Sequence, residues 1–195
     1  MRAGSHLRNL RPGIAAAVVA ALGIASCGGS RQDAHEPSGH FKVAVHGAFP
    51  SQQKLAKRSR MVITVKNVDH RTLPNVSVTV RSFNRNSTQA NLADPSRPVF
   101  VVNTGPRGGE TANQDTSALG PLAPGKTATF VWKVTAVQAG PYKIRYQVSA
   151  GLYGKAIAVD AAGNQSPGGL FHGTISNAAP HSTVNFKNGK TVEGG

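Results

Sequence analysis

Residues 127–148 read TATFVWKVTAVQAGPYKIRYQV, and the alternation within this stretch decides the fold. Apolar or aromatic side chains occupy every second position on both sides of Gly140-Pro141. Successive side chains of an extended strand point to opposite faces, so this spacing predicts two strands that each bury one face. We expect Trp132 and Tyr146 to point into the core, because each shares its face with other apolar residues.

The same alternation recurs on both sides of this stretch, in segments separated by clusters of Gly, Pro, Asn and Asp. These segments are 41–45, 61–65 and 76–80, with shorter apolar pieces at 99–102, 156–159, 170–175, 183–186 and 191–192. Many short strands with turn residues between them predict an all-β fold, an antiparallel sandwich. Segments 84–98 and 105–124 are expected to be long loops. The predicted core consists of Val43, Val45, Ile63, Val65, Val78, Val80, Phe130, Trp132, Ile144, Tyr146 and Val148.

Two parts of the sequence resemble a known kind of module. The first is MVITVKN at 61–67 followed by PNVSVTV at 74–80, and the second is LAPGKTATFVWKV at 122–134 followed by AGPYKIRY at 139–146. They are similar to the bacterial immunoglobulin-like modules of the CARDB type (cell-adhesion-related domains). The resemblance covers residues 41–150 and implies an immunoglobulin-like sandwich that binds, spaces or scaffolds rather than catalyses. Asn67, after the first strand, is expected to bridge the following turn with its side chain.

Residues 151–195 exceed the usual length of such a module. They are expected either to extend the sandwich or to form a small accessory hairpin before the C-terminal tail.

The first 27 residues are typical of an export signal that ends in a lipid-attachment site. A basic start is followed by an apolar run at 14–24, which is shorter than the roughly 20 residues needed to span a bilayer. Residues 24–27 read IASC, and Cys27 is the only cysteine of the chain. This segment resembles a bacterial lipoprotein signal, which implies a diacylglyceryl group on the Cys27 sulfur and removal of residues 1–26.

This resemblance predicts where the protein works. We expect export, and a lipid anchor on the outer face of the bacterial cytoplasmic membrane, or on the outer membrane of a host that has one. Residues 27–40 are polar and without periodicity, so they are expected to form a flexible tether. Because Cys27 is the only thiol and is expected to carry lipid, neither a disulfide nor a thiolate metal site is expected.

The chain is strongly basic, with 22 Lys and Arg against 8 Asp and Glu. Without the three arginines of the signal, 19 basic residues remain, a net charge of about +11. Export argues against nucleic acid as the partner, so anionic lipid headgroups, an anionic wall polymer or a protein are the expected partners. Most basic residues are scattered, but one group is expected to project from a single connection between the first two strands: Lys54, Lys57, Arg58 and Arg60.

The sequence contains no convincing nucleotide-binding or catalytic motif. Residues 120–127 (GPLAPGKT) match the letters of a nucleotide-binding P-loop, but Pro121 and Pro124 have no N–H for phosphate and a strand is predicted to follow instead of a helix. The acidic residues stand singly in turn-rich segments, and no GxSxG motif occurs. The sequence therefore predicts a protein that is not an enzyme and that uses neither nucleotide nor cofactor.

An alternative function is the binding of a small ligand or a metal ion through His and loop residues. His46 and His172 each precede a Gly in a predicted strand, and they would form such a site if they met across a sheet. Tyr153, which lies between glycines, is the best candidate for an exposed ring that contacts a ligand.

Overall fold

The computed structural model describes residues 35–87, 89, 91, 93, 96–108, 110–113, 115–178 and 182–193, all within the unit Gln32–Gly195. None of these residues lies in a helix, so the predicted all-β class is confirmed. It follows that no helix in this part of the chain is long and apolar enough to cross a bilayer. The expected signal peptide (1–26), Cys27 and the tether up to residue 34 lie outside the described residues.

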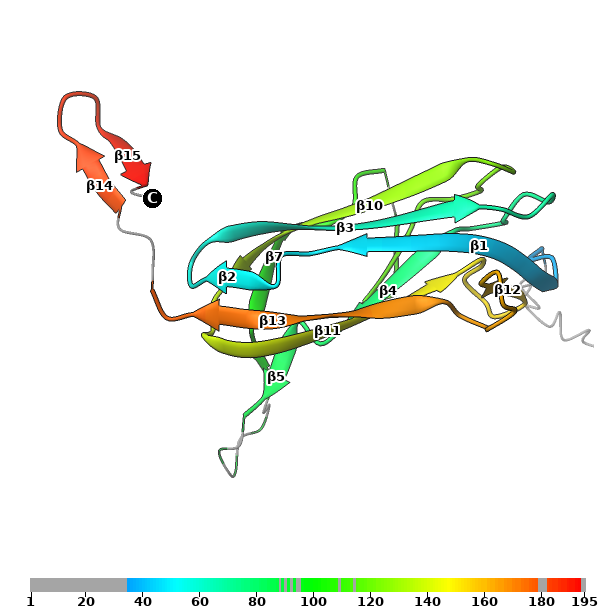
Figure 1. Cartoon of the computed structure of the whole chain (residues 1–195), viewed down its shortest axis with the longest axis horizontal. Coiled ribbons are helices and arrows are strands. Elements are labelled where there is room, and N and C mark those ends of the chain that lie inside the picture. The colour runs from blue at the N-terminus through cyan, green and yellow to red at the C-terminus, as the bar shows by residue number, and fades with distance from the viewer. Residues whose placement is uncertain are drawn as a thin grey trace, which may run out of the picture. The chain divides into compact units, whose positions relative to one another are not determined.

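Two β-sheets form the layers of a sandwich, with β1, β3 and β10 in one layer and β11 and β13 in the other (Figure 1). The first sheet has the order β12-β1-β3-β10-β7, and its neighbours are antiparallel except β1 and β12. Its strands are β1 (Gly39–Ala48), β3 (Arg58–Asn67), β7 (Phe100–Thr104), β10 (Thr127–Ala136) and β12 (Ala156–Val159).

The second sheet has the order β2-β13-β11-β4-β9-β8, with one parallel pair, β2 and β13. Its strands are β2 (Gln52–Lys54), β4 (Ser77–Arg81), β8 (Glu110–Asn113), β9 (Thr116–Ala118), β11 (Gly140–Ser149) and β13 (Gly168–Ser176). The C-terminal part of the chain therefore adds β12 to one sheet and β13 to the other. Both alternatives for residues 151–195 occur, because a separate hairpin follows β13.

That hairpin pairs β14 (Ser182–Asn185) with β15 (Lys190–Glu193). A second two-stranded ribbon pairs β5 (Asn84–Asn86) with β6 (Ser96–Pro98). The sequence predicted that segments 84–98 and 105–124 are long loops. This prediction is wrong in part, because the two segments contain β5, β6, β8 and β9. These strands have few apolar residues, so pairing with a neighbouring strand rather than burial defines them.

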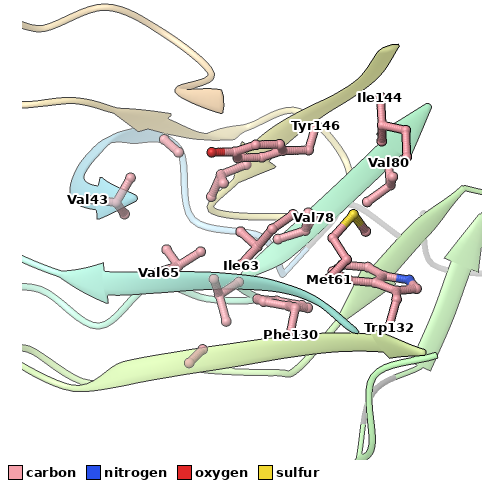
Figure 2. Packing of buried hydrophobic residues seen from close by; sticks show 14 of the residues in the cluster. Val43, Met61, Ile63, Val65, Val78, Val80, Phe130, Trp132, Ile144 and Tyr146 are labelled. Carbon is pink, nitrogen blue, oxygen red and sulfur yellow. The ribbon is translucent and has the colours of Figure 1, made fainter. Parts of the chain in front are cut away.

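The core lies between the two sheets, where side chains of β3 and β10 meet those of β4 and β11 (Figure 2). In β10 and β11 every second residue is buried, as the alternation predicts. Ten of the eleven predicted core residues are buried, and the other, Val45, is partly buried. Trp132 is stacked on Phe130, with ring centroids 6.1 Å apart.

The described end of the expected tether is ordered. Gly39 and His40 begin β1, where they pair with Ala156 and Ile157 of β12. Three residues earlier, the carboxylate of Glu36 accepts hydrogen bonds from backbone N–H groups of the loop that follows β11. Their donor–acceptor distances are 2.6 Å for Leu152, 3.1 Å for Tyr153 and 3.0 Å for Lys155. A flexible tether would therefore end before residue 36 rather than at residue 40.

A buried amide closes the turn after β3, as predicted for Asn67. Its Nδ2 donates to the carbonyl oxygens of Arg71 and Leu122, both at 2.8 Å, and its Oδ1 accepts from the N–H of Asp69 at 2.9 Å. Asn67 is fully buried, and all of these groups would lose their partners if the side chain were shortened. This one side chain thus joins β3 to the loop before β10.

The neighbouring carboxylate of Asp69 ties the same turn to β1. It accepts from the backbone N–H of Lys42 at 3.1 Å and from the N–H and Nε of Arg71 at 3.0 and 3.2 Å. These bonds, first of all that from the Arg71 side chain, favour the charged form and hold the pKa of Asp69 well below its ordinary value. The Arg71 guanidinium also lies 4.3 Å from the ring centroid of Phe41.

Candidate functional site

The predicted basic group lies around one hollow beside the start of β3. Lys54 ends β2, Lys57 lies in the connection that follows, and Arg58 and Arg60 belong to β3. All four line a hollow of about 530 Å³. They are therefore close together, as expected, but the interpretation that all lie in one connection is wrong.

The backbone explains why the connection is so short. The N–H of Ala56 donates to the carbonyl oxygen of Ala136 at 2.8 Å, which holds residues 55–57 against the end of β10. Ala56 has a φ of 61°, so the chain turns sharply there and β3 begins at Arg58. Pairing with β10 then extends through the basic residues, because Arg58 and Arg60 face Thr135 and Lys133.

A second hollow, of about 420 Å³, adjoins the first through Arg60, which lines both. Arg107, in the turn after β7, and Lys133, on β10, line this second hollow. No Asp or Glu among the described residues lines either hollow. We call the six basic residues around the two hollows the basic face: Lys54, Lys57, Arg58, Arg60, Arg107 and Lys133.

The centre of the basic face is a pair of like charges in direct register. Arg60 on β3 and Lys133 on β10 are opposite each other, and both are exposed on the outer side of the first sheet. Like charges placed directly opposite on neighbouring strands destabilise a sheet. An anion held between them would offset this repulsion, and guanidinium groups bind phosphate or carboxylate oxygens in pairs. The face is thus suited to an anionic ligand.

Sequence reasoning missed Lys133 and Arg107 as members of this face. The alternation of 127–134 contains a signal for Lys133, because it places that residue on the side opposite Trp132. Its position beside Arg60 depends on the register between β3 and β10, which no local pattern contains.

Tyr153 has an exposed ring, as predicted, with 49% of its surface accessible. It lies in the loop between β11 and β12, where its N–H is bonded to Glu36. It lines neither hollow of the basic face, so the structure does not bring it together with the basic residues.

The two histidines of the alternative site do not meet. His46 lies on β1 in the first sheet and faces Thr64, whereas His172 lies on β13 in the second sheet and faces Lys143. Both are exposed, so they point outward from different layers. The condition for such a site, that the two histidines meet across a sheet, is not fulfilled, because their strands belong to different sheets. Within the described ranges, no three His, Cys, Asp or Glu residues are grouped as a metal site requires.

The P-loop-like segment forms a turn that leads into β10. The N–H of Lys126 donates to the carbonyl oxygen of Ala123 at 3.1 Å, and the N–H of Gly125 donates to that of Asn67 at 2.9 Å. Gly120 and Gly125 have φ values of 80° and 74°, which explains the glycines of the pattern without a phosphate ligand.

No family model and no curated protein matches the chain. Among solved structures it is similar to the crystal structure of a CARDB domain from Pyrococcus furiosus in complex with di-metal ions. The TM-score is 0.45 and the identity 14%, over 70% of this chain and 94% of that one. The solution structure of the same CARDB domain gives a TM-score of 0.43 and 14% identity, over 68% and 93% of the two chains.

The chain is also similar to native alpha-2-macroglobulin from Escherichia coli, with a TM-score of 0.44 and 15% identity. That match covers 72% of this chain and 7% of the much longer macroglobulin. CARDB domains are thus among the solved structures that the chain is similar to, as the sequence resemblance predicts, and the similarity concerns the fold.

Proposed function

We propose that the protein is a non-enzymatic binding module, anchored outside the cytoplasmic membrane by lipid on Cys27, whose basic face holds an anionic wall polymer. The observation that carries the proposal is the opposition of Arg60 and Lys133 in the β3–β10 register, between two hollows. This arrangement costs the fold stability unless an anion lies across it.

The shape of the basic face favours an extended ligand over a compact one. Its six residues surround two adjoining hollows, so their charges are spread over several strands rather than focused on one point. A polymer with repeated phosphate or carboxylate groups can meet such charges one after another. Because the residues are exposed, salt screens the attraction, and binding should weaken as the ionic strength rises.

The tether limits how far from the membrane the module works. Glu36 is fixed to the loop after β11, so only the chain from Cys27 to Glu36 is left to span the distance to the bilayer. At about 3.5 Å per residue this segment reaches at most roughly 30 Å. The module would therefore contact polymer close to the membrane surface.

The proposal predicts that binding depends on the basic face and not on net charge. The lipidated protein in nanodiscs of neutral lipid is titrated with a purified poly(glycerol phosphate). The variant Arg58→Gln/Arg60→Gln/Lys133→Gln should bind roughly tenfold more weakly, a loss of about 1.4 kcal/mol. The control Lys126→Gln/Lys187→Gln/Lys190→Gln removes the same charge from exposed positions that line neither hollow, and should stay within about twofold of wild type.

Equal losses in the two variants would refute the proposal, since they would show attraction by net charge alone. The lipid alternative is tested by the same proteins with anionic vesicles. If the first variant loses vesicle binding while its polymer affinity is unchanged, the basic face contacts lipid headgroups and the polymer proposal is wrong.

A further inference from the structure

A second pair of like charges stands in direct register on the other sheet. Arg81 on β4 is opposite Arg145 on β11, and both side chains are exposed. The adjacent residues Val80, Ile144 and Tyr146 are buried in the core, so the two arginines point outward from the second sheet. We call Arg81 and Arg145 the arginine pair. Its repulsion is again unfavourable for the sheet in the absence of an anion.

The surroundings of the arginine pair are open and contain hydrogen-bonding groups. A hollow of about 540 Å³ is lined by both arginines together with Gln147, Ser166, Gly168 and Leu170, among others, and no acidic residue of the described part lines it. Gly168, which pairs with Gln147, lines this hollow with its backbone alone. Asp115 borders a separate hollow that Arg81 also lines, and no ion pair joins the two.

We infer that the arginine pair is a second anion site and that the module bridges two strands of anionic polymer, one on each sheet. This inference rests on the proposed function of the basic face. Two guanidinium groups on neighbouring strands are held by a rigid sheet and match the oxygens of phosphate or carboxylate groups. The core of the sandwich lies between the arginine pair and the residues Arg60 and Lys133, because both pairs point away from the buried side of their own sheet.

Bridging is measured with the lipidated protein in neutral nanodiscs that hold one copy each. Beads coated with poly(glycerol phosphate) capture the protein, and fluorescent poly(glycerol phosphate) is then added. A bridging module recruits the labelled polymer to the beads. We expect wild type to recruit at least fivefold more label than beads without protein. The variant Arg81→Gln/Arg145→Gln should still be captured within about twofold of wild type but should lose at least four-fifths of the recruited label.

The matched control is Lys187→Gln/Lys190→Gln, which removes the same charge from the β14–β15 hairpin and should recruit label like wild type. Failure of the beads to capture any protein would refute the proposed function itself. Capture without recruitment by wild type, or recruitment that persists in Arg81→Gln/Arg145→Gln, would leave the basic face in place and overturn the bridging inference.

Discussion

Asn67 and Asp69 form a hydrogen-bond network at the end of β3, in a fold whose other buried side chains are mostly apolar. The Asp69 side chain is only 6% exposed, and its carboxylate accepts hydrogen bonds from Lys42 on β1 and from Arg71. Burial of a charge is costly unless hydrogen bonds compensate it, and here they do. The sequence predicted the role of Asn67, because an Asn after a strand is a common turn residue. The link from Asp69 to β1 depends on the N–H of Lys42, which lies far away in the sequence.

The lowered pKa of Asp69 predicts how stability depends on pH. The unfolded chain takes up a proton near pH 4, whereas the folded state keeps the carboxylate charged to lower pH. The stabilisation is therefore fully present above about pH 4 and is lost as the pH falls towards the folded pKa. Asp69→Asn should cost about 1–3 kcal/mol at pH 7 and should flatten the decline in unfolding free energy between about pH 4 and pH 2.

Urea denaturation of both proteins across this pH range measures the effect. The difference between them isolates Asp69, because all the other carboxyl groups are common to both. A constant difference from pH 7 to pH 2 would contradict the prediction.

At the scale of elements, the strands with strict alternation were predicted well and those without it were not. β3, β10 and β11 bury every second side chain, which makes their pattern visible in the sequence. β5, β6, β8 and β9 have no such pattern, because pairing rather than burial of alternate side chains defines them: β5 pairs with β6, β8 with β9, and β9 also with the distant β4. Strand β13 begins two residues earlier than predicted, with Gly168 and Gly169. The prediction left these two residues out because glycine is disfavoured in strands.

A close contact with Tyr146 explains one of these strand glycines. A Cβ on Gly169 would lie 2.5 Å from the Tyr146 hydroxyl oxygen and 2.7 Å from two ring carbons. The ring is stacked on Phe171, with ring centroids 4.9 Å apart, and its hydroxyl oxygen also lies close to Gly47. Gly169→Ala should therefore destabilise the domain by about 1–3 kcal/mol through overpacking.

Thermal unfolding followed by circular dichroism would show this loss. The control is Gly105→Ala, where nothing lies within 4 Å of the added Cβ and the effect should stay within about 0.5 kcal/mol. Equal stability of the two variants would mean that the Tyr146 ring adapts.

At the scale of the whole molecule, the sequence indicated four of the six residues of the basic face and neither residue of the arginine pair. The run from Lys54 to Arg60 is visible as a local cluster, but Lys133 and the arginine pair are single residues in alternating strands. Only the registers β3–β10 and β4–β11 turn them into opposed like charges. Such registers are set by packing of the complete sandwich, so these two pairs of opposed like charges could not be predicted from local patterns.

The membrane anchor is the part of the proposal that depends on sequence alone, and it can be tested directly. Cys27 is the only thiol of the chain, so Cys27→Ser should abolish incorporation of labelled fatty acid in bacterial cells. The variant should then either be released from the membrane fraction or accumulate as a larger, uncleaved precursor. As a control, Cys27→Ser/Ser30→Cys restores a thiol three residues later and should remain unlabelled, because a lipoprotein signal specifies the position of its cysteine. Fatty acid on the Cys27→Ser chain, with membrane association that resists a high-salt wash, would refute the lipid anchor and leave the tether without its attachment point.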